Sequence, residues 1–440
     1  MYAFKYTTRA LTMSPEFMLV TFVLFLAGSI AVPIASRLGL GSVLGYLIAG
    51  IIISPMFTVM GVDVAALQHF AEFGIVMMLF LIGLEMQPRE LWLMRSKIFV
   101  MGGLQIGLTT ILVMTISMSF GYVWSMSLTI GLVFALSSTA IVNQTLIEKR
   151  LSKSMGGRCS LAVLLAQDIT VIPILIMLPL LATPDLIELV LIELLELTDV
   201  NQQDYHVTVN TVSLVEGLNG WQATVVTFMA VGGVIVLGKF AVTPLFRFVA
   251  QARLRELFLS TALLVVVGIA LLMTLVGLPP ALGAFLAGVV LASSEYKHEL
   301  ENNIDPYRGL LLGLFFITIG AGINFGLLFN SFTIIISLTV GLIVLKSVVL
   351  LLLTVIYKLQ GTDRWLFSLG LAQAGEFGLV LVTLSVTKAV LPRELADSLI
   401  LIVTLSMLLT PMIFFIYDKF IAPSKNEAPK QKTNNIDKEI

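Results

Sequence analysis

Long apolar stretches separated by short polar turns run through the whole 440-residue chain. An apolar run of about 20 residues is long enough to cross the hydrocarbon core of a bilayer as a helix. The pattern predicts thirteen such helices, or twelve if a run interrupted by Gly or Pro is discounted. The predicted spans are residues 17–36, 43–58, 73–87, 98–118, 124–147, 159–183, 221–246, 257–276, 278–294, 309–325, 332–357, 365–387 and 395–417.

The composition supports this interpretation. Hydrophobic residues make up 58% of the chain and charged residues only 12%, and a soluble protein of this length could not cover so much apolar surface. The predicted fold class is therefore an all-α polytopic membrane protein. The single cysteine, Cys159, excludes an intrachain disulfide scaffold. The first apolar run is too long for a signal peptide, and no cleavage pattern follows it.

The distribution of Lys and Arg predicts the orientation. If the N-terminus lies outside, the inner loops and the C-terminal tail hold 20 of the 26 basic residues, and the outer segments hold four. This positive-inside bias predicts an integral plasma (inner) membrane protein whose N-terminus is outside and whose C-terminus is cytoplasmic. The longest loop, 184–220, contains no Lys or Arg and is expected outside. Residues 421–440 are polar and are predicted to form a disordered cytoplasmic tail.

Two motifs recur at an offset of 237–238 residues. LGYLIAG (44–50) returns as LGAFLAG (282–288), and GIVMMLFLIG (74–83) is echoed by LLGLFFITIG (311–320). The matching spans run in opposite directions, so the sequence predicts two inverted six-helix repeats, the architecture of secondary transporters. The transmembrane domain, 1–420, then divides into a first repeat at 17–183, an outer loop plus linker helix at 184–246, and a second repeat at 257–417.

The offset also locates two candidate broken helices. ALSSTAIVNQ (135–144) corresponds to AQAGEFG (372–378). Runs of small and hydroxylated residues break an apolar helix easily, and the freed carbonyls can replace the water around a cation. Ser137, Ser138 and Thr139 are therefore candidate ligands, although small residues also permit close helix packing.

Four of the charged residues within the predicted spans are candidates for a functional role: Asp168, Lys346, Glu376 and Glu85. A charge inside the bilayer is costly and usually marks an ion pathway or a pair. Asp168 has no charged neighbour within nine residues, and it is either a carboxylate that binds a proton or an ion, which is the favoured role, or a fixed ion pair or hydrogen-bonded strut. Lys346 is either a counter-ion to Asp168 or a partner for a broken-helix end. Glu376 either takes part in binding or neutralises a helix dipole, and Glu85 is either a site residue or a cytoplasmic pairing group.

Other functional classes find little support. The zinc-protease motif H-E-x-x-H is absent, the three histidines are scattered, and only one aspartate is central, so an enzyme is not expected. A potassium channel would need a TVGYG-like filter, which is also absent. No cofactor and no nucleic-acid partner is expected, and lipid surrounds the spans.

Five stretches together resemble the membrane domain of Kef-type potassium efflux antiporters, of the monovalent cation:proton antiporter-2 family. They are residues 37–58, 69–92, 136–141, 164–175 and 283–324. The resemblance implies thirteen helices, two crossing broken helices, a homodimer and elevator-like alternating access. It also implies that Gln167 and Asp168 form the ion-binding pair and that Lys346 is the basic residue of the opposite repeat.

The chain departs from this resemblance in two ways. Kef proteins continue into a cytoplasmic nucleotide-binding domain that binds glutathione adducts, whereas this chain has no G-x-G-x-x-G after a strand, so direct glutathione gating is not expected. The stretch HELENNIDP (298–306) resembles the family's regulatory loop, with His298, Glu301 and Asp305 as candidate residues. A separate cytoplasmic regulatory subunit is one way to replace the missing domain.

The sequence therefore predicts a secondary antiporter that exchanges a monovalent cation for H⁺. One buried carboxylate can hold a proton or a cation but not both, so competition at Asp168 predicts electroneutral 1:1 exchange. Gln167 and residues 137–139 would supply neutral oxygens. The resemblance favours K⁺. A Na⁺/H⁺ antiporter on the same fold and a channel-like K⁺ efflux protein remain the alternatives.

Overall fold

The structure is a computed structural model, and it describes residues 15–38, 42–59, 76–77, 79–81, 83–84, 98–182, 220–251, 255–292 and 294–422. Every regular element in these ranges is a helix, which confirms the predicted all-α class. The helices are α1 (Pro15–Arg37), α2 (Ser42–Val59), η1 (Ile98–Gly102), α5 (Gly103–Ser119), α6 (Trp124–Ala135), α7 (Thr139–Glu148), α8 (Met155–Met177), η2 (Leu178–Leu181), α10 (Gly220–Ala250), α11 (Arg255–Leu275), α12 (Pro280–Ala292), α13 (Lys297–Ala321), α14 (Phe325–Asn330), α15 (Phe332–Ile356), α16 (Gly361–Gly370), α17 (Glu376–Thr387), α18 (Arg393–Ile416) and η3 (Tyr417–Ile421).

Most predicted spans coincide with these helices to within a few residues. Within the described ranges, seven helices or continuous helix pairs are long and apolar enough to cross a membrane, and α10, whose two arms are bent by 41°, makes an eighth. α2, α12 and α17 are apolar but shorter. The chain is thus an integral membrane protein, and the total of thirteen crossings stays a prediction. Residues 184–219 of the predicted outer loop (184–220), residues 423–440 of the predicted tail (421–440) and most of span 73–87 lie outside the described residues.

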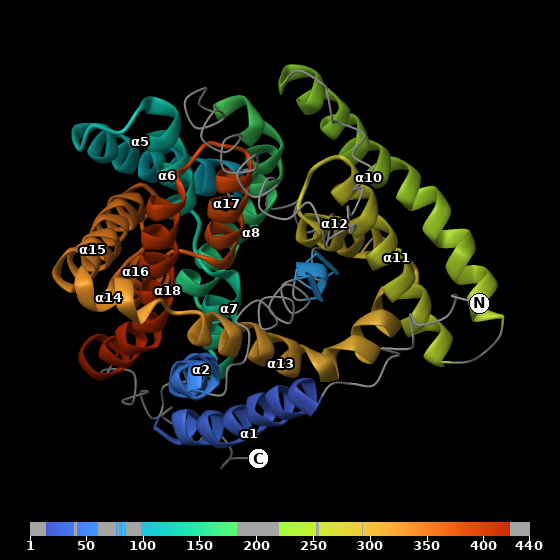
Figure 1. Cartoon of the computed structure of the whole chain (residues 1–440), viewed down its shortest axis with the longest axis horizontal. Coiled ribbons are helices and arrows are strands. Elements are labelled where there is room, and N and C mark those ends of the chain that lie inside the picture. The colour runs from blue at the N-terminus through green and yellow to red at the C-terminus, as the bar shows by residue number, and fades with distance from the viewer. Residues whose placement is uncertain are drawn as a thin grey trace, which may run out of the picture.

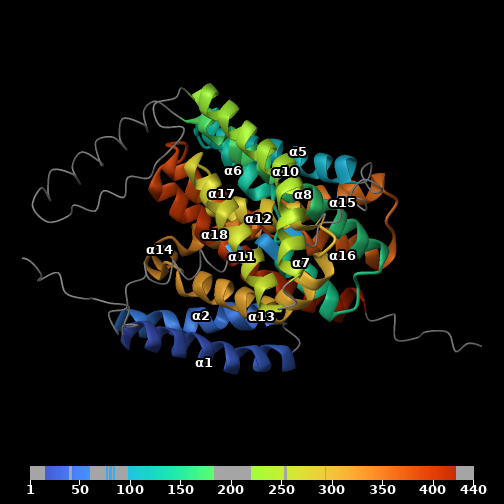
Figure 2. The same cartoon turned by 90° about the vertical axis from the view of Figure 1, so that its right-hand side faces the viewer.

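The helices form two groups around the middle of the molecule. In Figure 1, α5, α6, α8 and α15–α18 gather on one side, and α10, α11 and α12 lie on the other. α13 packs against α2, which in turn packs against α1, and Figure 2 shows these three helices together along one edge.

Four glycines join the two repeats in a reciprocal way. A Cβ at Gly50 would lie 2.1 Å from the carbonyl oxygen of Ile317, and one at Gly320 would lie 2.3 Å from that of Leu47. The same contact recurs between the echoed motifs, where a Cβ at Gly83 or Gly288 would lie 2.2 Å from the carbonyl oxygen of Phe285 or Phe80, respectively. No side chain fits at such backbone contacts. Each repeat therefore supplies one partner to each crossing, as two related repeats must.

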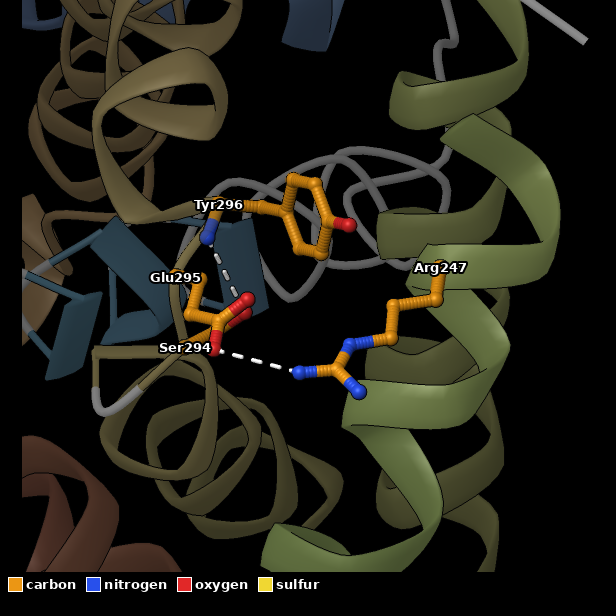
Figure 3. Close-up of polar contacts among 4 residues, drawn as sticks. All are labelled: Arg247, Ser294, Glu295 and Tyr296. Atoms are coloured by element: carbon orange, nitrogen blue, oxygen red, sulfur yellow. Dashed lines mark hydrogen bonds and ion pairs between the residues drawn. The ribbon is translucent and has the colours of Figure 1, made fainter. Parts of the chain in front are cut away.

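Three aromatic rings hold α10 and α11 to the turn between α12 and α13. Phe246, Phe258 and Tyr296 have ring centroids 5.5 to 6.0 Å apart. Figure 3 shows the polar contacts of this turn, where Arg247 lies 3.3 Å from Glu295 and the backbone N–H of Tyr296 donates to Ser294 Oγ. The ion pair is solvent-exposed, so burial of the rings contributes most of the stabilisation.

The predicted loop at 298–306 is wrong, because these residues form the first turns of α13. The polar sequence hid a helix stabilised by side-chain pairs three and four residues apart. Lys297 lies 3.2 Å from Glu301, and His298 Nδ1 lies 3.3 Å from the same carboxylate. Asp305 belongs to the same helix. A regulatory role for His298, Glu301 and Asp305 stays a prediction.

Candidate functional site: two broken helices that cross

The two predicted helix breaks are present, and they cross each other. Residues 136–138 separate α6 from α7, and residues 371–375 separate α16 from α17. Ser138 and Gly375 both have extended backbone. A Cβ at Gly375 would lie 2.5 Å from the carbonyl carbon and oxygen of Ser137. Only glycine permits this approach, and it brings four half-helix ends together at one point.

Lys346 binds the carbonyl ends of these half-helices. It lies on α15 and is fully buried. Its Nζ donates to Leu136 O at 3.1 Å and to Gln373 O at 2.6 Å, and it lies 3.0 Å from Ser137 Oγ. The carbonyl ends of helices carry partial negative charge, which an ammonium group stabilises. Of the two predicted roles for Lys346, the structure supports the broken-helix partner rather than direct pairing with Asp168.

Two buried carboxylates lie at the opposite pole, at the start of α7. Asp168, on α8, is 1% exposed, and Thr139 Oγ1 donates to its two oxygens at 3.0 and 3.2 Å. Glu376, the first residue of α17, is 2% exposed, and its Oε1 accepts the N–H of Ala140 at 3.3 Å. Thr139 and Ala140 are the first two residues of α7. The helix N-terminus favours negative charge, whereas the two carboxylates repel each other.

Gln167 holds the break in place. Its Oε1 accepts the N–H of Ser137 at 2.8 Å, and its Nε2 donates to Gln105 Oε1 at 2.6 Å. Gln105 Nε2 donates in turn to Ala135 O at 3.0 Å. The predicted neutral-oxygen role of Gln167 would compete with the bond from Ser137. The geometry therefore favours a positioning role for Gln167: its bonds hold the first helix break next to Asp168.

The predicted hydroxyl residues divide into two roles. Ser137 Oγ donates to Leu371 O at 2.8 Å and so ties the first break to the second. Ser138 caps α7, because its Oγ accepts the N–H of Ile141 at 3.3 Å. Only Thr139 directs its hydroxyl to Asp168. The structure thus brings together Asp168, Gln167, residues 137–139, Lys346 and Glu376, while Glu85 lies outside the described residues.

Three polar residues at the crossing did not emerge from the sequence. Gln105 lies in the predicted apolar span 98–118, where its side-chain amide could have been noticed as a buried polar group. Gln373 corresponds to the apolar Leu136 in the other repeat. Comparison of the two repeats therefore does not indicate a polar residue at this position. Ser406 Oγ accepts the N–H of Ala374 at 3.0 Å, a contact that only the folded structure reveals.

Three comparisons with known proteins extend these observations. A family model described as sodium/hydrogen exchanger, transmembrane, matches residues 21–417. The glutathione-regulated potassium-efflux system protein KefC of Cronobacter sakazakii is 40% identical over 413 residues, which are 94% of this chain and 62% of that protein. This chain therefore spans less than two thirds of that relative. The sodium proton antiporter MjNhaP1 from Methanocaldococcus jannaschii, solved at pH 8, matches with a TM-score of 0.60 and 18% identity over 92% of this chain and 98% of that chain, which shows a shared fold.

Proposed function

The chain belongs to the sodium/hydrogen exchanger family, and from this premise we propose that it exchanges a monovalent cation for H⁺ across a membrane by alternating access. Asp168 is the group that holds the proton or the cation in turn. The observation that carries this proposal is the burial of Asp168 at the helix crossing, with Thr139 as its hydroxyl partner. A cation at this point meets oxygen ligands, and a proton meets a carboxylate shielded from water.

The charges at the crossing suit 1:1 exchange. Lys346 and Glu376 offset each other, one at the carbonyl ends and one at the N–H ends of the half-helices. With these two charged, the crossing is neutral when Asp168 is protonated and neutral again when ionised Asp168 holds a monovalent cation. Only ionised, empty Asp168 leaves an uncompensated charge. Moving that state through a low-dielectric environment is costly, which discourages uncoupled movement.

K⁺ is the favoured cation. Its support is the 40% identity to a protein named for potassium efflux. Na⁺ is the second candidate, on the same fold. We do not extend the glutathione regulation named for that relative to this chain, because the match covers only 62% of the relative's length.

The orientation and partners complete the proposal. The excess of Lys and Arg in alternate loops supports an outside N-terminus and a cytoplasmic C-terminus in a plasma or inner membrane. The partners are membrane lipid, a second copy of the chain and a separate cytoplasmic regulatory subunit.

The test uses proteoliposomes that contain a pH-sensitive dye and carry an imposed pH gradient. K⁺ or Na⁺ is added to the wild type, to Asp168→Asn and to Asp397→Asn, the last being an exposed acid on α18 that serves as the control. We expect cation-driven proton movement in the wild type and in the control, and none in Asp168→Asn. Exchange that survives in Asp168→Asn would reject Asp168 as the shared site. Potassium flux without proton movement in the wild type would support a channel instead.

A further inference from the structure

Among the residues that the structure describes, three buried polar atoms at and beside the second break have no hydrogen-bond partner: Gln373 Oε1, Gln373 Nε2 and Glu376 Oε2. Gln373 is fully buried and Glu376 is 2% exposed. Buried side-chain polar atoms are nearly always paired, so a cluster of unpaired ones calls for an explanation. The two side chains do not satisfy each other, although they are three residues apart.

The other side-chain oxygens of the crossing are already engaged. Gln167 Oε1 accepts the N–H of Ser137, and Ser137 Oγ lies between Lys346 and Leu371 O. The freed carbonyl of Gln373 itself accepts Lys346 at 2.6 Å. A cation that enters the crossing would have to displace these bonds to use those oxygens. Gln373 Oε1 and Glu376 Oε2 have no such bond to a described residue that a cation would have to displace.

Both residues are held firmly at the crossing. The backbone of Gln373 is fixed by Lys346, and the intervening Gly375 touches Ser137. Glu376 Oε1 is held by the N–H of Ala140, the residue after the threonine that donates to Asp168. The unpaired oxygens thus belong to the segment that passes the start of α7.

We propose that Gln373 Oε1 and Glu376 Oε2 bind the transported cation together with Asp168. This inference rests on the proposed antiport and extends its site from the first repeat to both repeats. Carboxylate and amide oxygens replace the hydration shell of an alkali cation, and the number and strength of such oxygens determine which ion is preferred. The amide of Gln373 is therefore a determinant of the choice between K⁺ and Na⁺.

The first experiment measures the cation dependence of exchange in proteoliposomes. Gln373→Met removes the amide at nearly constant volume, Gln373→Asn withdraws it by one methylene group, and Glu376→Gln removes the charge. The matched control is Gln144→Met, in the middle of α7, where the amide donates to Glu148. We expect Gln373→Met to raise KM for K⁺ by about tenfold, the loss of one interaction with a charged group, with little change in kcat. Gln373→Asn should change the ratio of the KM values for K⁺ and Na⁺, and Glu376→Gln should raise KM for both ions.

The second experiment measures cation binding without transport. A ligand that binds the folded state raises its melting temperature, so K⁺ should stabilise the purified wild type and Gln144→Met, but stabilise Gln373→Met much less. If the amide is only an unsatisfied packing defect, Gln373→Met will melt at a higher temperature and keep both its KM and its stabilisation by K⁺. That result would overturn the inference while leaving the antiport intact. If the wild type shows no cation-driven proton movement, the proposed function fails first.

Discussion

Replacing Lys346 tests whether it acts through its hydrogen bonds or through its charge. Lys346→Met removes both, whereas Lys346→Gln removes the charge but keeps two N–H donors. Both variants relieve the desolvation of an ammonium group, so the difference between them reports the hydrogen bonds. The two carbonyls that depend most on Lys346 are Leu136 O and Gln373 O, at 3.1 and 2.6 Å.

A buried acceptor without a donor costs about 1–3 kcal/mol, so two carbonyls make Lys346→Met less stable than Lys346→Gln by about 2–6 kcal/mol. The assay is thermal unfolding of both variants in the same detergent, with the wild type alongside. We expect Lys346→Gln to have the higher midpoint. If Lys346→Met is equally stable or more stable, the carbonyls do not need the donor, and the role of Lys346 is its charge.

Three further predictions address the contacts around the site. Thr139→Val should raise KM for the cation about tenfold because Asp168 loses its hydroxyl donor, while Thr139→Ser should keep a KM near that of the wild type. Cation titrations of exchange measure both KM values, and equal effects of the two variants would contradict the prediction. Gly83→Ala should destabilise the protein by about 1–3 kcal/mol, because the added Cβ would lie 2.2 Å from a backbone oxygen. Its thermal unfolding midpoint should be lower than that of the control Gly103→Ala, where nothing lies within 4 Å of the added Cβ. Gln105→Leu should slow exchange by leaving Gln167 Nε2 without its closest acceptor; a rate equal to that of the wild type would show that the amide pair does not position the site.

Much of this fold could be predicted because the bilayer restricts the choices. Apolar length places the helices, and the repeat offset places both breaks, since residues 136–138 and 371–375 lie close to the predicted motifs. The start of α13 was misjudged because its apolar part begins near residue 309, whereas side-chain pairs extend the helix back to Lys297. A hydropathy pattern does not register such pairs.

The candidate site could be predicted only as a set of residues. The sequence indicates Asp168, Lys346 and Glu376 as costly charges, but it does not tell which group each one contacts. The contacts in the structure distinguish the roles of these residues: Lys346 donates to backbone carbonyls, and Gln167 accepts from a backbone N–H. The unpaired state of Gln373 could not be seen in the sequence, because hydrogen bonding depends on the complete fold around a side chain.

The two repeats share a helix break but not their charges, and this difference is consistent with the proposal of one exchanging site rather than two. The counterparts of Asp168, Lys346 and Glu376, 237 residues away, are Leu405, Thr109 and Thr139. The first repeat thus supplies the carboxylate that we propose to exchange, while the second supplies Lys346 and Glu376 at the two ends of the crossing. If a second aspartate replaced Leu405, two carboxylates would have to be neutralised in each step. The difference in these three side chains between the two repeats therefore matches the proposed exchange of a single cation for a single proton.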